Sequence, residues 1–525
     1  MLSQSGQTGS GQTGSGQTRS VWMITSSLEQ PLPLTQDERA DVCIIGAGIA
    51  GLTAAYLLTK AGKRVVVLDD GPIGGGESCR TTAHLSNVID DRYTRIERVH
   101  GLENSRLACE AHTSAIHRIG LICQEEGIDC GFERLDGYLF AGPDHDVEFL
   151  QAELQAAQRA GLVQAAFVSR APGGFDTGPC IRFPEQGQFH PLKYMLGLAG
   201  AIRSGGGRLL MGHAKADIKG GDRIEVSTRE GHVIDAGHVL VMTNSPVTDR
   251  VRIHTKQAPY RTYAVAARID PSVMPHMLLW DTMDPYHYVR LQRGADGQDW
   301  LIVGGEDHKT GQDAQPQIHW QRLEEWTRQR FAIGQIDARW SGQVMETIDG
   351  LAFIGPDPSG ERNVYIATGD SGMGMTHGTI AGVLLTDLVM GRQSPWSAVF
   401  DPSRKRTGAA GEFVKENVNV AGQYMDWASG SEVDTVDQIA PQSGAVIRRG
   451  IRKVAVYRDA DNRLHEFSAS CPHLGCVVSW NKAEGTWDCP CHGSRFEATG
   501  QVINGPANAN LSEETSQSQR QRESA

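Results

Sequence analysis

The chain of 525 residues lacks any apolar run long enough to cross a membrane as a helix. It also lacks an excess of positive charge, because 50 Lys and Arg residues against 62 Asp and Glu residues give a net charge of −12. This balance and a pI near 5.8 disfavour nucleic-acid binding. A chain of this length is instead expected to hold several domains with large cores.

The N-terminus shows no signal peptide, so the cytoplasm is the expected location. Residues 1–35 are predicted to form a disordered tail, because the repeats of Ser-Gly-Gln-Thr-Gly at its beginning are polar and flexible. Met23 is an alternative start, which leaves open whether residues 1–22 belong to the native protein. Residues 511–525 are predicted to be a second polar tail.

Of the ten cysteines, four lie close together near the C-terminus. Cys471 and His473 form a Cys-x-His motif, and Cys489 and His492 form a Cys-x-x-His motif. Zinc loops usually carry one ligand type each, whereas here each loop supplies one Cys and one His. That division suits a [2Fe–2S] cluster with both thiolates on an inner iron and both imidazoles on an outer one. A zinc site or a disulfide-linked loop pair is the less favoured alternative.

The segment 433–510, including Gly505-Pro506-Ala507, resembles the Rieske domain in the disulfide-bearing form found in cytochrome bc-type complexes. The resemblance implies a disulfide between Cys476 and Cys491, and a hydroxyl donor to a cluster sulfur at Ser494. High-potential members carry Tyr where this chain has Phe496. Because donors to the sulfurs raise the potential, we expect a lower potential than in those members. The other six cysteines are interpreted as reduced core residues.

A dinucleotide-binding motif lies near the start of the α/β region. An apolar strand at 41–45 runs into Gly46-Ala47-Gly48-Ile49-Ala50-Gly51, a helix follows from Leu52, and a second strand ends at Asp69. In this context Gly46 permits the tight turn, Gly48 lets a pyrophosphate approach the helix N-terminus, and Gly51 allows close packing. Asp69 is expected to accept from ribose hydroxyls.

A second glycine-rich loop favours FAD over NAD. Residues 369–376 follow a strand at 364–368 and precede a helix at 377–390, which can place backbone N–H groups against a flavin. Residues 36–395, including the loop 74–84 and the stretch 188–193, resemble the D-amino-acid oxidase (DAO) superfamily. The resemblance implies FAD contacts from the following residues: Arg80, Thr81, Thr82, Gly369, Gly372 and Met375. Thr81 falls where some relatives carry the flavin-attaching His, so non-covalent FAD is expected.

The predicted architecture is an α/β Rossmann-like FAD-binding domain with an inserted antiparallel-sheet substrate domain, followed by a small all-β Rieske domain. The oxidoreductase is predicted over 36–400, with FAD-binding parts at about 36–130, 196–254 and 346–395. Its substrate parts are about 131–195 and 255–345. Residues 401–432 are predicted to be a connector with one helix.

The substrate side is less well defined by the sequence. Alternation over 286–291 places Tyr286, Tyr288 and Arg290 on one face of a strand. Arg290 beside Tyr288 could clamp a substrate carboxylate; the alternative is an ion-paired strand arginine. His308 and His377 are interpreted as structural, and no catalytic base is identified.

Together the motifs predict a dehydrogenase that oxidises a C–N bond of a small amine or amino acid. Electrons would pass from FAD to the cluster, and His473 and His492 would face an external single-electron acceptor. The alternatives are an oxygen-using oxidase whose Rieske domain senses redox state or docks a partner, and an electron-transfer reductase. A reductase is disfavoured because no second nucleotide motif is evident. A Rieske oxygenase is excluded because no site with two His and a carboxylate follows the cluster. Substrate, acceptor and oligomeric state are not defined by the sequence.

Overall fold

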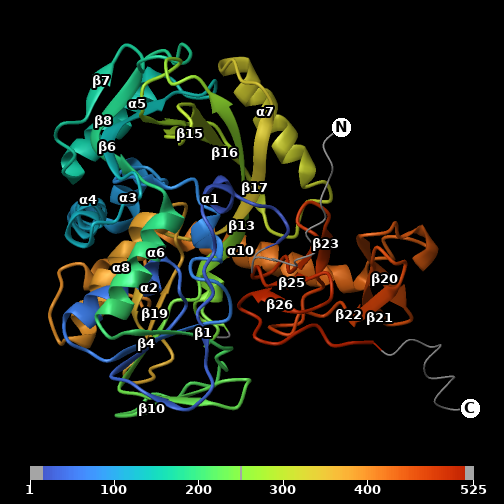
Figure 1. Cartoon of the computed structure of the whole chain (residues 1–525). Coiled ribbons are helices and arrows are strands. Elements are labelled where there is room, and N and C mark those ends of the chain that lie inside the picture. The colour runs from blue at the N-terminus through green and yellow to red at the C-terminus, as the bar shows by residue number, and fades with distance from the viewer. Residues whose placement is uncertain (1–15, 249–250, 515–525) are drawn as a thin grey trace, which may run out of the picture.

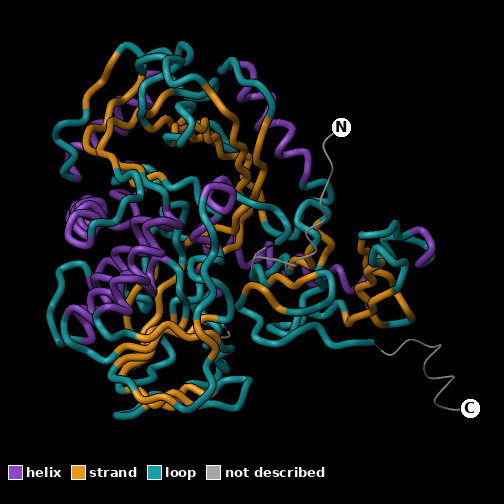
Figure 2. Tube along the Cα trace, in the orientation of Figure 1, coloured by secondary structure: helices purple, strands orange, loops and turns teal. Residues whose placement is uncertain are grey.

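A computed structural model of the chain describes residues 16–248 and 251–514. Figure 1 shows an FAD-type α/β region at lower left, a large sheet above it, and the C-terminal strands to the right. Figure 2 shows helices gathered on one side of the α/β strands. No helix in these two ranges is long and apolar enough to span a membrane.

The α/β region is built on a seven-stranded sheet in which only β18 is antiparallel to its neighbour. Its strands are short, and the inner strands β3, β4 and β19 are almost fully buried, as expected for a parallel sheet covered on both faces. In spatial order they are β1 (Leu32–Pro33), β9 (Arg208–Met211), β4 (Val65–Asp69), β3 (Val42–Ile45), β12 (His238–Val241), β19 (Val364–Thr368) and β18 (Phe353–Pro356). All but β1 fall within the three predicted FAD-binding parts.

Helices cover this sheet and connect it to the rest of the oxidoreductase. Gly378 and Gly382 of α8 lie against α2, where an added Cβ would be 2.7 and 2.5 Å from side-chain atoms of Ile49 and Thr53. The helices are α2 (Ile49–Lys60), α3 (Tyr93–His100), α4 (Leu102–Glu126), α5 (Val147–Ala160), α6 (Pro191–Ser204), α8 (Gly374–Val389) and α9 (Ser397–Phe400). A three-stranded sheet of β10 (Ile224–Ser227), β11 (Val233–Ala236) and β2 (Glu38–Arg39) packs on the other face of the seven-stranded sheet.

The predicted substrate sheet is present and is antiparallel except where β6 pairs with β14. One face packs on the helices of the α/β region, and the other forms a separate core under α7 (Gln317–Arg330). In spatial order its strands are β17 (Ile336–Thr347), β13 (Gln257–Ile269), β16 (Asp299–Lys309), β15 (His287–Gln292), β14 (Leu278–Asp281), β6 (Glu133–Phe140), β8 (Cys180–Gln188) and β5 (His84–Leu85), with β7 (Ala166–Val168) on β8.

The C-terminal region is all-β, as predicted. One sheet contains β20 (Ser443–Arg449), β21 (Arg452–Arg458) and β22 (Leu464–Ser468). The other contains β23 (Ser479–Asn481), β24 (Thr486–Asp488), β25 (Arg495–Glu497) and β26 (Val502–Asn504). The two cysteine-bearing loops lie between β22 and β23 and between β24 and β25.

The prediction of a disordered tail through residue 35 is wrong for residues 16–35. Helix α1 (Val21–Thr25) buries Trp22 completely, and the Trp22 indole donates to the carbonyl of Thr81 at 2.6 Å. Ser20 caps the helix and donates to the carbonyl of Cys79 at 2.6 Å. The apolar run after a capping serine marks this helix in the sequence. Residues 1–15 of the predicted tail lie outside the described residues.

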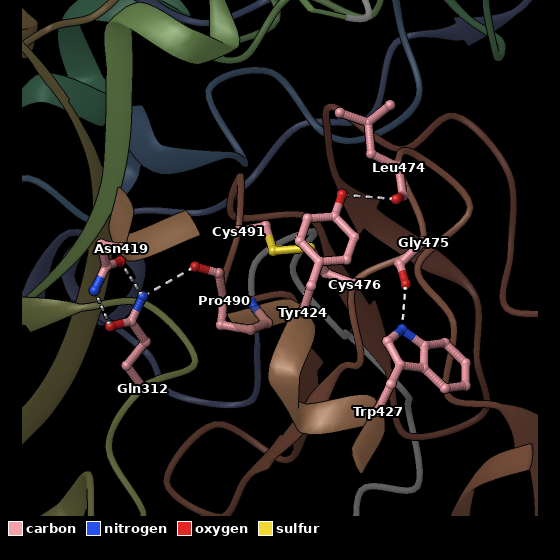
Figure 3. The surroundings of a disulfide bond; sticks show 9 residues. All are labelled: Gln312, Asn419, Tyr424, Trp427, Leu474, Gly475, Cys476, Pro490 and Cys491. Atoms are coloured by element: carbon pink, nitrogen blue, oxygen red, sulfur yellow. Dashed lines mark hydrogen bonds between the residues drawn. A yellow bond between two sulfur atoms is a disulfide. The ribbon is translucent and has the colours of Figure 1, made fainter. Parts of the chain in front are cut away.

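The connector contains one main helix, α10 (Ala410–Gln423), followed by a short 3₁₀ turn, η4 (Tyr424–Ala428). Figure 3 shows that this segment holds the first cysteine loop. The Tyr424 hydroxyl donates to the carbonyl of Leu474 at 2.8 Å, and the Trp427 indole to that of Gly475 at 3.0 Å. The side-chain amide of Gln312 donates to Oδ1 of Asn419 at 2.9 Å and to the carbonyl of Pro490 at 3.1 Å.

Candidate active site and iron–sulfur centre

Two helix N-termini meet at one cavity of about 350 Å³. Helix α2 begins after Gly48 at the end of β3, and α8 begins at Gly374 after β19. Strands β3 and β19 both flank β12 in parallel, so their carboxyl ends lie at the same edge of the sheet. The unpaired N–H groups and positive dipole ends of two helices suit a ligand with anionic groups.

Glycines at this cavity are required by its shape. Gly46 has φ 113°, and a Cβ there would lie 2.3 Å from the carbonyl oxygen of Met242. Gly372 has φ 72°, and its Cβ would lie 2.3 Å from Oδ2 of Asp90. Larger residues at either position would therefore fill the cradle or distort it. This fits a nucleotide that approaches the backbone closely.

Nine of the ten residues predicted to bind FAD line the cavity: Gly46, Gly48, Asp69, Arg80, Thr81, Thr82, Gly369, Gly372 and Met375. The tenth, Gly51, lies behind it, where a Cβ would be 1.9 Å from the carbonyl oxygen of Gly46. Its role in close helix–strand packing agrees with this position. Direct FAD contact by each of the nine remains a prediction.

Asp69 ends β4 at the cavity. Its carboxylate accepts from the backbone N–H of Ala47 at 2.5 Å and of Gly71 at 2.8 Å. Burial, with the neighbouring Asp70, raises the pKa of Asp69 above its ordinary value. A carboxylate has further acceptor positions, so these two bonds leave room for a ribose hydroxyl.

Arg80 lies at the cavity, but its guanidinium is directed elsewhere. It donates to the Thr18 hydroxyl at 2.9 Å and to the carbonyl of Ser341 at 3.0 Å, and it lies 3.6 Å from Glu484 of the C-terminal domain. Arg80 therefore joins the loop 74–84, called the flavin-type loop below, to three other parts of the chain: the N-terminal segment, strand β17 and the C-terminal domain. These partners are far away in sequence, which explains why sequence reasoning missed them.

On the substrate side, Tyr286 and Tyr288 line the cavity and Arg290 does not. The Arg290 guanidinium is fully buried and donates to the carbonyls of Thr82, Ala83 and Phe189 at 2.8–3.1 Å. The carboxylate-clamp hypothesis is thus not supported by the geometry; Arg290 ties strand β15 to the flavin-type loop. His377 lines the cavity, whereas His308 stacks on His319 outside it.

Two carboxylates at this end of the cavity, Asp90 and Asp307, were not predicted from the sequence. No motif marks them, because they come together only when β16 packs beside the loop after β5. Asp307 directly precedes His308, the residue that the sequence singled out instead.

The four predicted cluster ligands converge from the two cysteine loops. Cys471, Cys489 and His492 are buried, and the rings of His473 and His492 lie 4.9 Å apart, nearly perpendicular. Cys476 and Cys491 form the expected disulfide between the loops. The Cys489 thiol, with a contribution from the Ser494 hydroxyl, holds the pKa of Cys471 below its ordinary value. Two thiols and two imidazoles in a buried pocket fit a Rieske-type [2Fe–2S] cluster.

The imidazole side of this centre faces the oxidoreductase domain. The ring of His254, just before β13, lies 4.9 Å from that of His473 and 5.8 Å from that of His492. The expectation that both ligands face an external acceptor is wrong for His492, which is 6% exposed. The Rieske loop 502–508 also reaches the first cavity, where Val502, Ile503 and Asn504 line it.

The fold and the two sites define an FAD-dependent oxidoreductase with an iron–sulfur domain, and comparisons with known proteins agree. Residues 41–388 match the family described as FAD dependent oxidoreductase (DAO), and residues 430–515 match the Rieske [2Fe-2S] domain. The chain belongs to the DAO family and carries a C-terminal Rieske domain. Its cofactors are accordingly FAD and one [2Fe–2S] cluster.

The chain is similar to known proteins over most of its length, as three of them show. It is 32% identical to the Rieske 2Fe-2S iron–sulfur protein YhfW of Bacillus subtilis (strain 168), over 93% of this chain and 95% of that one. It is 27% identical to gamma-glutamylputrescine oxidoreductase of Escherichia coli (strain K12), over 68% of this chain and 85% of that one. The structure of glycine oxidase from Geobacillus kaustophilus superposes with a TM-score of 0.58 at 17% identity, over 70% of this chain and 99% of that one.

Proposed function

We propose that the protein is a dehydrogenase that oxidises a C–N bond of an amine or amino acid and delivers the electrons through its Rieske domain to an external acceptor. FAD, held by the glycine-rich turns at Gly46–Gly48 and Gly369–Gly372, would supply hydride acceptance for oxidation of the carbon beside the substrate nitrogen, and water would hydrolyse the resulting imine. A [2Fe–2S] cluster takes one electron at a time, so a single-electron acceptor is expected. We expect FAD to be held without a covalent bond, because Thr81 falls where some relatives carry the attaching His; His84 lines the same cavity and its ring nitrogens bond to Thr82 and to the carbonyl of Val289.

The observation that carries this proposal is the position of the imidazole ligands. His473 and His492 face His254 of the oxidoreductase domain, and the loop 502–508 of the same Rieske domain lines the flavin-type cavity. A module used only for docking a partner has no need of this arrangement. An electron path within one chain needs this arrangement, because the ligands of the outer iron then face the flavin domain.

The electrons would leave on the far edge of the first cysteine loop. His473 is partly exposed there, and the neighbouring Leu474 is 38% exposed. An acceptor that docks on this edge would reach the outer iron without displacing the contact with His254.

Anaerobic mixing with a panel of amines and amino acids tests the proposal. Flavin bleaching is followed by absorbance, and reduction of the cluster by its paramagnetic signal. We expect the cluster signal to appear after flavin bleaching without any added mediator. A cluster that stays oxidised while air restores the flavin colour would instead identify an oxygen-using oxidase.

A further inference from the structure

Two carboxylates and two tyrosines form one wall of the cavity. Asp90 accepts a hydrogen bond from the Tyr286 hydroxyl at 2.8 Å, and the Tyr288 hydroxyl pairs with that of Thr262 at 2.6 Å. The rings of Tyr286 and Tyr288 lie 5.3 Å apart, and Asp307 completes the wall. Oδ1 of Asp307 is buried and has no hydrogen-bond partner among the described residues.

An irregularity in the sheet places Asp307 at the cavity. Arg261 pairs with His308 and Tyr263 with Gly305, so Thr262 alone lies opposite the two residues Glu306 and Asp307. Glu306 takes φ 60° at this bulge, a left-handed conformation that is costly for a residue other than glycine. Bulges of this kind commonly redirect a side chain next to an active site.

The two adjacent acids have different surroundings because of this bulge. Glu306 lies on the outer face, 3.7 Å from His287 and 3.5 Å from His319. Asp307 lies on the cavity face and has no ion pair in residues 16–248 and 251–514. Asp307 is half-buried, and a carboxylate without a counter-charge in such a site takes up a proton more readily or favours a ligand that carries positive charge.

Within residues 16–248 and 251–514 no positive side chain forms an ion pair with Asp90 or Asp307, although the charge of Arg92 acts on Asp90 through space. The Arg92 guanidinium, which lines the same cavity, donates to the backbone carbonyls of Asp90 at 3.0 Å and Asp281 at 3.1 Å. Arg290 is held outside the cavity, as described above. Carboxylates bind ammonium groups by charge-assisted hydrogen bonds, and tyrosine faces attract cations, including alkylated ones.

We propose that this wall binds the substrate through its positively charged nitrogen, held between Asp307, Asp90 and the two tyrosine rings, and that the substrate class is a cationic amine that needs no α-carboxylate. The inference rests on the proposed C–N oxidation but concerns binding alone. It makes Asp307 a specificity-determining residue.

The test uses the holoenzyme and tetramethylammonium, a permanently charged probe that cannot be oxidised to an imine. Binding is measured by perturbation of the flavin absorption spectrum, with pivalate as an anion of similar bulk. We expect saturable binding of tetramethylammonium and none of pivalate. Asp307→Asn should weaken tetramethylammonium binding by roughly tenfold or more. The matched control Asp296→Asn, at an exposed turn at the other end of the same hairpin, should leave it unchanged.

The pH dependence of binding gives a second readout, because tetramethylammonium has no titratable proton. Burial raises the pKa of Asp307 to about 7; a hydrogen bond with Thr262 acts in the opposite direction, and the negative charge of Asp90 adds to the rise. The other charged groups that act on Asp307 and Asp90 are His287, Glu306, Glu346 and, on Asp90, Arg92. Because the raised pKa leaves the carboxylate uncharged below it, affinity should rise between about pH 6 and 8. Asp307→Asn should lose this step.

Three results would each overturn the inference. Tetramethylammonium could bind wild type and Asp307→Asn with equal affinity, pivalate could bind as tightly as tetramethylammonium, or tetramethylammonium could show no saturable binding. Full flavin and cluster absorbance in the purified variant shows that it has folded. Failure of the proposed electron path is seen separately, as a cluster that stays oxidised after substrate bleaches the flavin, and it leaves the binding result intact.

Discussion

Replacing Glu484 by alanine should release the Rieske domain from the oxidoreductase domain. The Glu484 side chain is completely buried, although it lies in the turn between β23 and β24. Its carboxylate is 3.6 Å from Arg80 and 3.4 Å from Arg261, and it also accepts from the hydroxyls of Thr18 and Ser341. One carboxylate therefore joins the flavin-type loop, strands β13 and β17, the N-terminal segment and the Rieske domain.

The expected size of the effect follows from these distances. Two unit charges 3.5 Å apart attract by about 5 kcal/mol at an effective dielectric constant of about 20. Desolvation offsets much of this, but removing one partner leaves the other charges buried, which costs about 3–5 kcal/mol. Since about 1.4 kcal/mol is a factor of ten, the ratio of docked to undocked protein should fall by about two to three and a half orders of magnitude.

Hydrogen exchange measures this ratio at the interface itself. We expect faster exchange in Glu484→Ala in peptides that carry the other interdomain bonds, those of Gln312, Gln343 and Asn504. Strands β20–β22 should exchange as in the wild type, because they lie inside the Rieske domain. Asp461→Ala, at an exposed turn of the same domain, is the control.

The pH dependence supplies an independent check on the same residue. Burial pushes the pKa of Glu484 up, but Arg80, Arg261 and Arg495 hold it below its ordinary value. A lowered pKa means that this stabilisation is present above about pH 4.3 and is lost as the pH falls through the folded-state pKa. The wild type and Glu484→Ala should therefore differ at pH 7 and converge in acid. Unchanged interface exchange in the variant at pH 7, a difference below about 1 kcal/mol, would refute the reasoning.

Three further predictions concern the cofactors. Phe496→Tyr should raise the cluster potential and Ser494→Ala should lower it. Each shift should be a few tens of millivolts, which corresponds to one hydrogen bond of about 1 kcal/mol gained or lost. A redox titration that finds no change in either variant would contradict this. Gly51→Ala should reduce flavin content and thermal stability, because its Cβ would lie 1.9 Å from the Gly46 carbonyl oxygen, whereas Gly200→Ala, on an open helix surface, should be neutral or stabilising. Acid precipitation should release all flavin into the supernatant, and colour left on the protein would show a covalent bond.

The nucleotide and cluster motifs were predictable because each is a short, contiguous pattern with a defined geometry. Gly46, Gly48 and Asp69 surround one turn between a strand and a helix, as the sequence predicts, although the helix begins at Ile49 rather than Leu52. The strand Val364–Thr368 matches its prediction residue for residue. In such segments local sequence and final contacts coincide, so little depends on distant packing.

The cavity wall of Asp90, Asp307, Tyr286 and Tyr288 and the interdomain contacts were not predictable, because they depend on residues that meet only in the folded chain. Alternation correctly placed Tyr286 and Tyr288 on one face, but it could not show that the next residue of the series, Arg290, is satisfied by carbonyls of the flavin-type loop. A sheet bulge shifts the register by one residue, and no sequence pattern marked the bulge that places Asp307.

Three separate tethers hold the Rieske domain in one position, and this bears on how the cluster is used. The connector holds the first cysteine loop through Tyr424 and Trp427 and is itself tied to the oxidoreductase domain by an ion pair of its Glu416 with Lys309 at 2.6 Å. Glu484 fixes the turn between β23 and β24, and Asn504 donates to Glu77 of the flavin-type loop at 3.0 Å. A domain that moved between flavin and acceptor would break all three on every cycle. A cluster held in place needs no such motion, because its His492 side faces the flavin domain and its Leu474 edge faces solvent. Under the proposed function the acceptor would come to the cluster, so the rate with saturating substrate should depend on acceptor concentration rather than on domain motion.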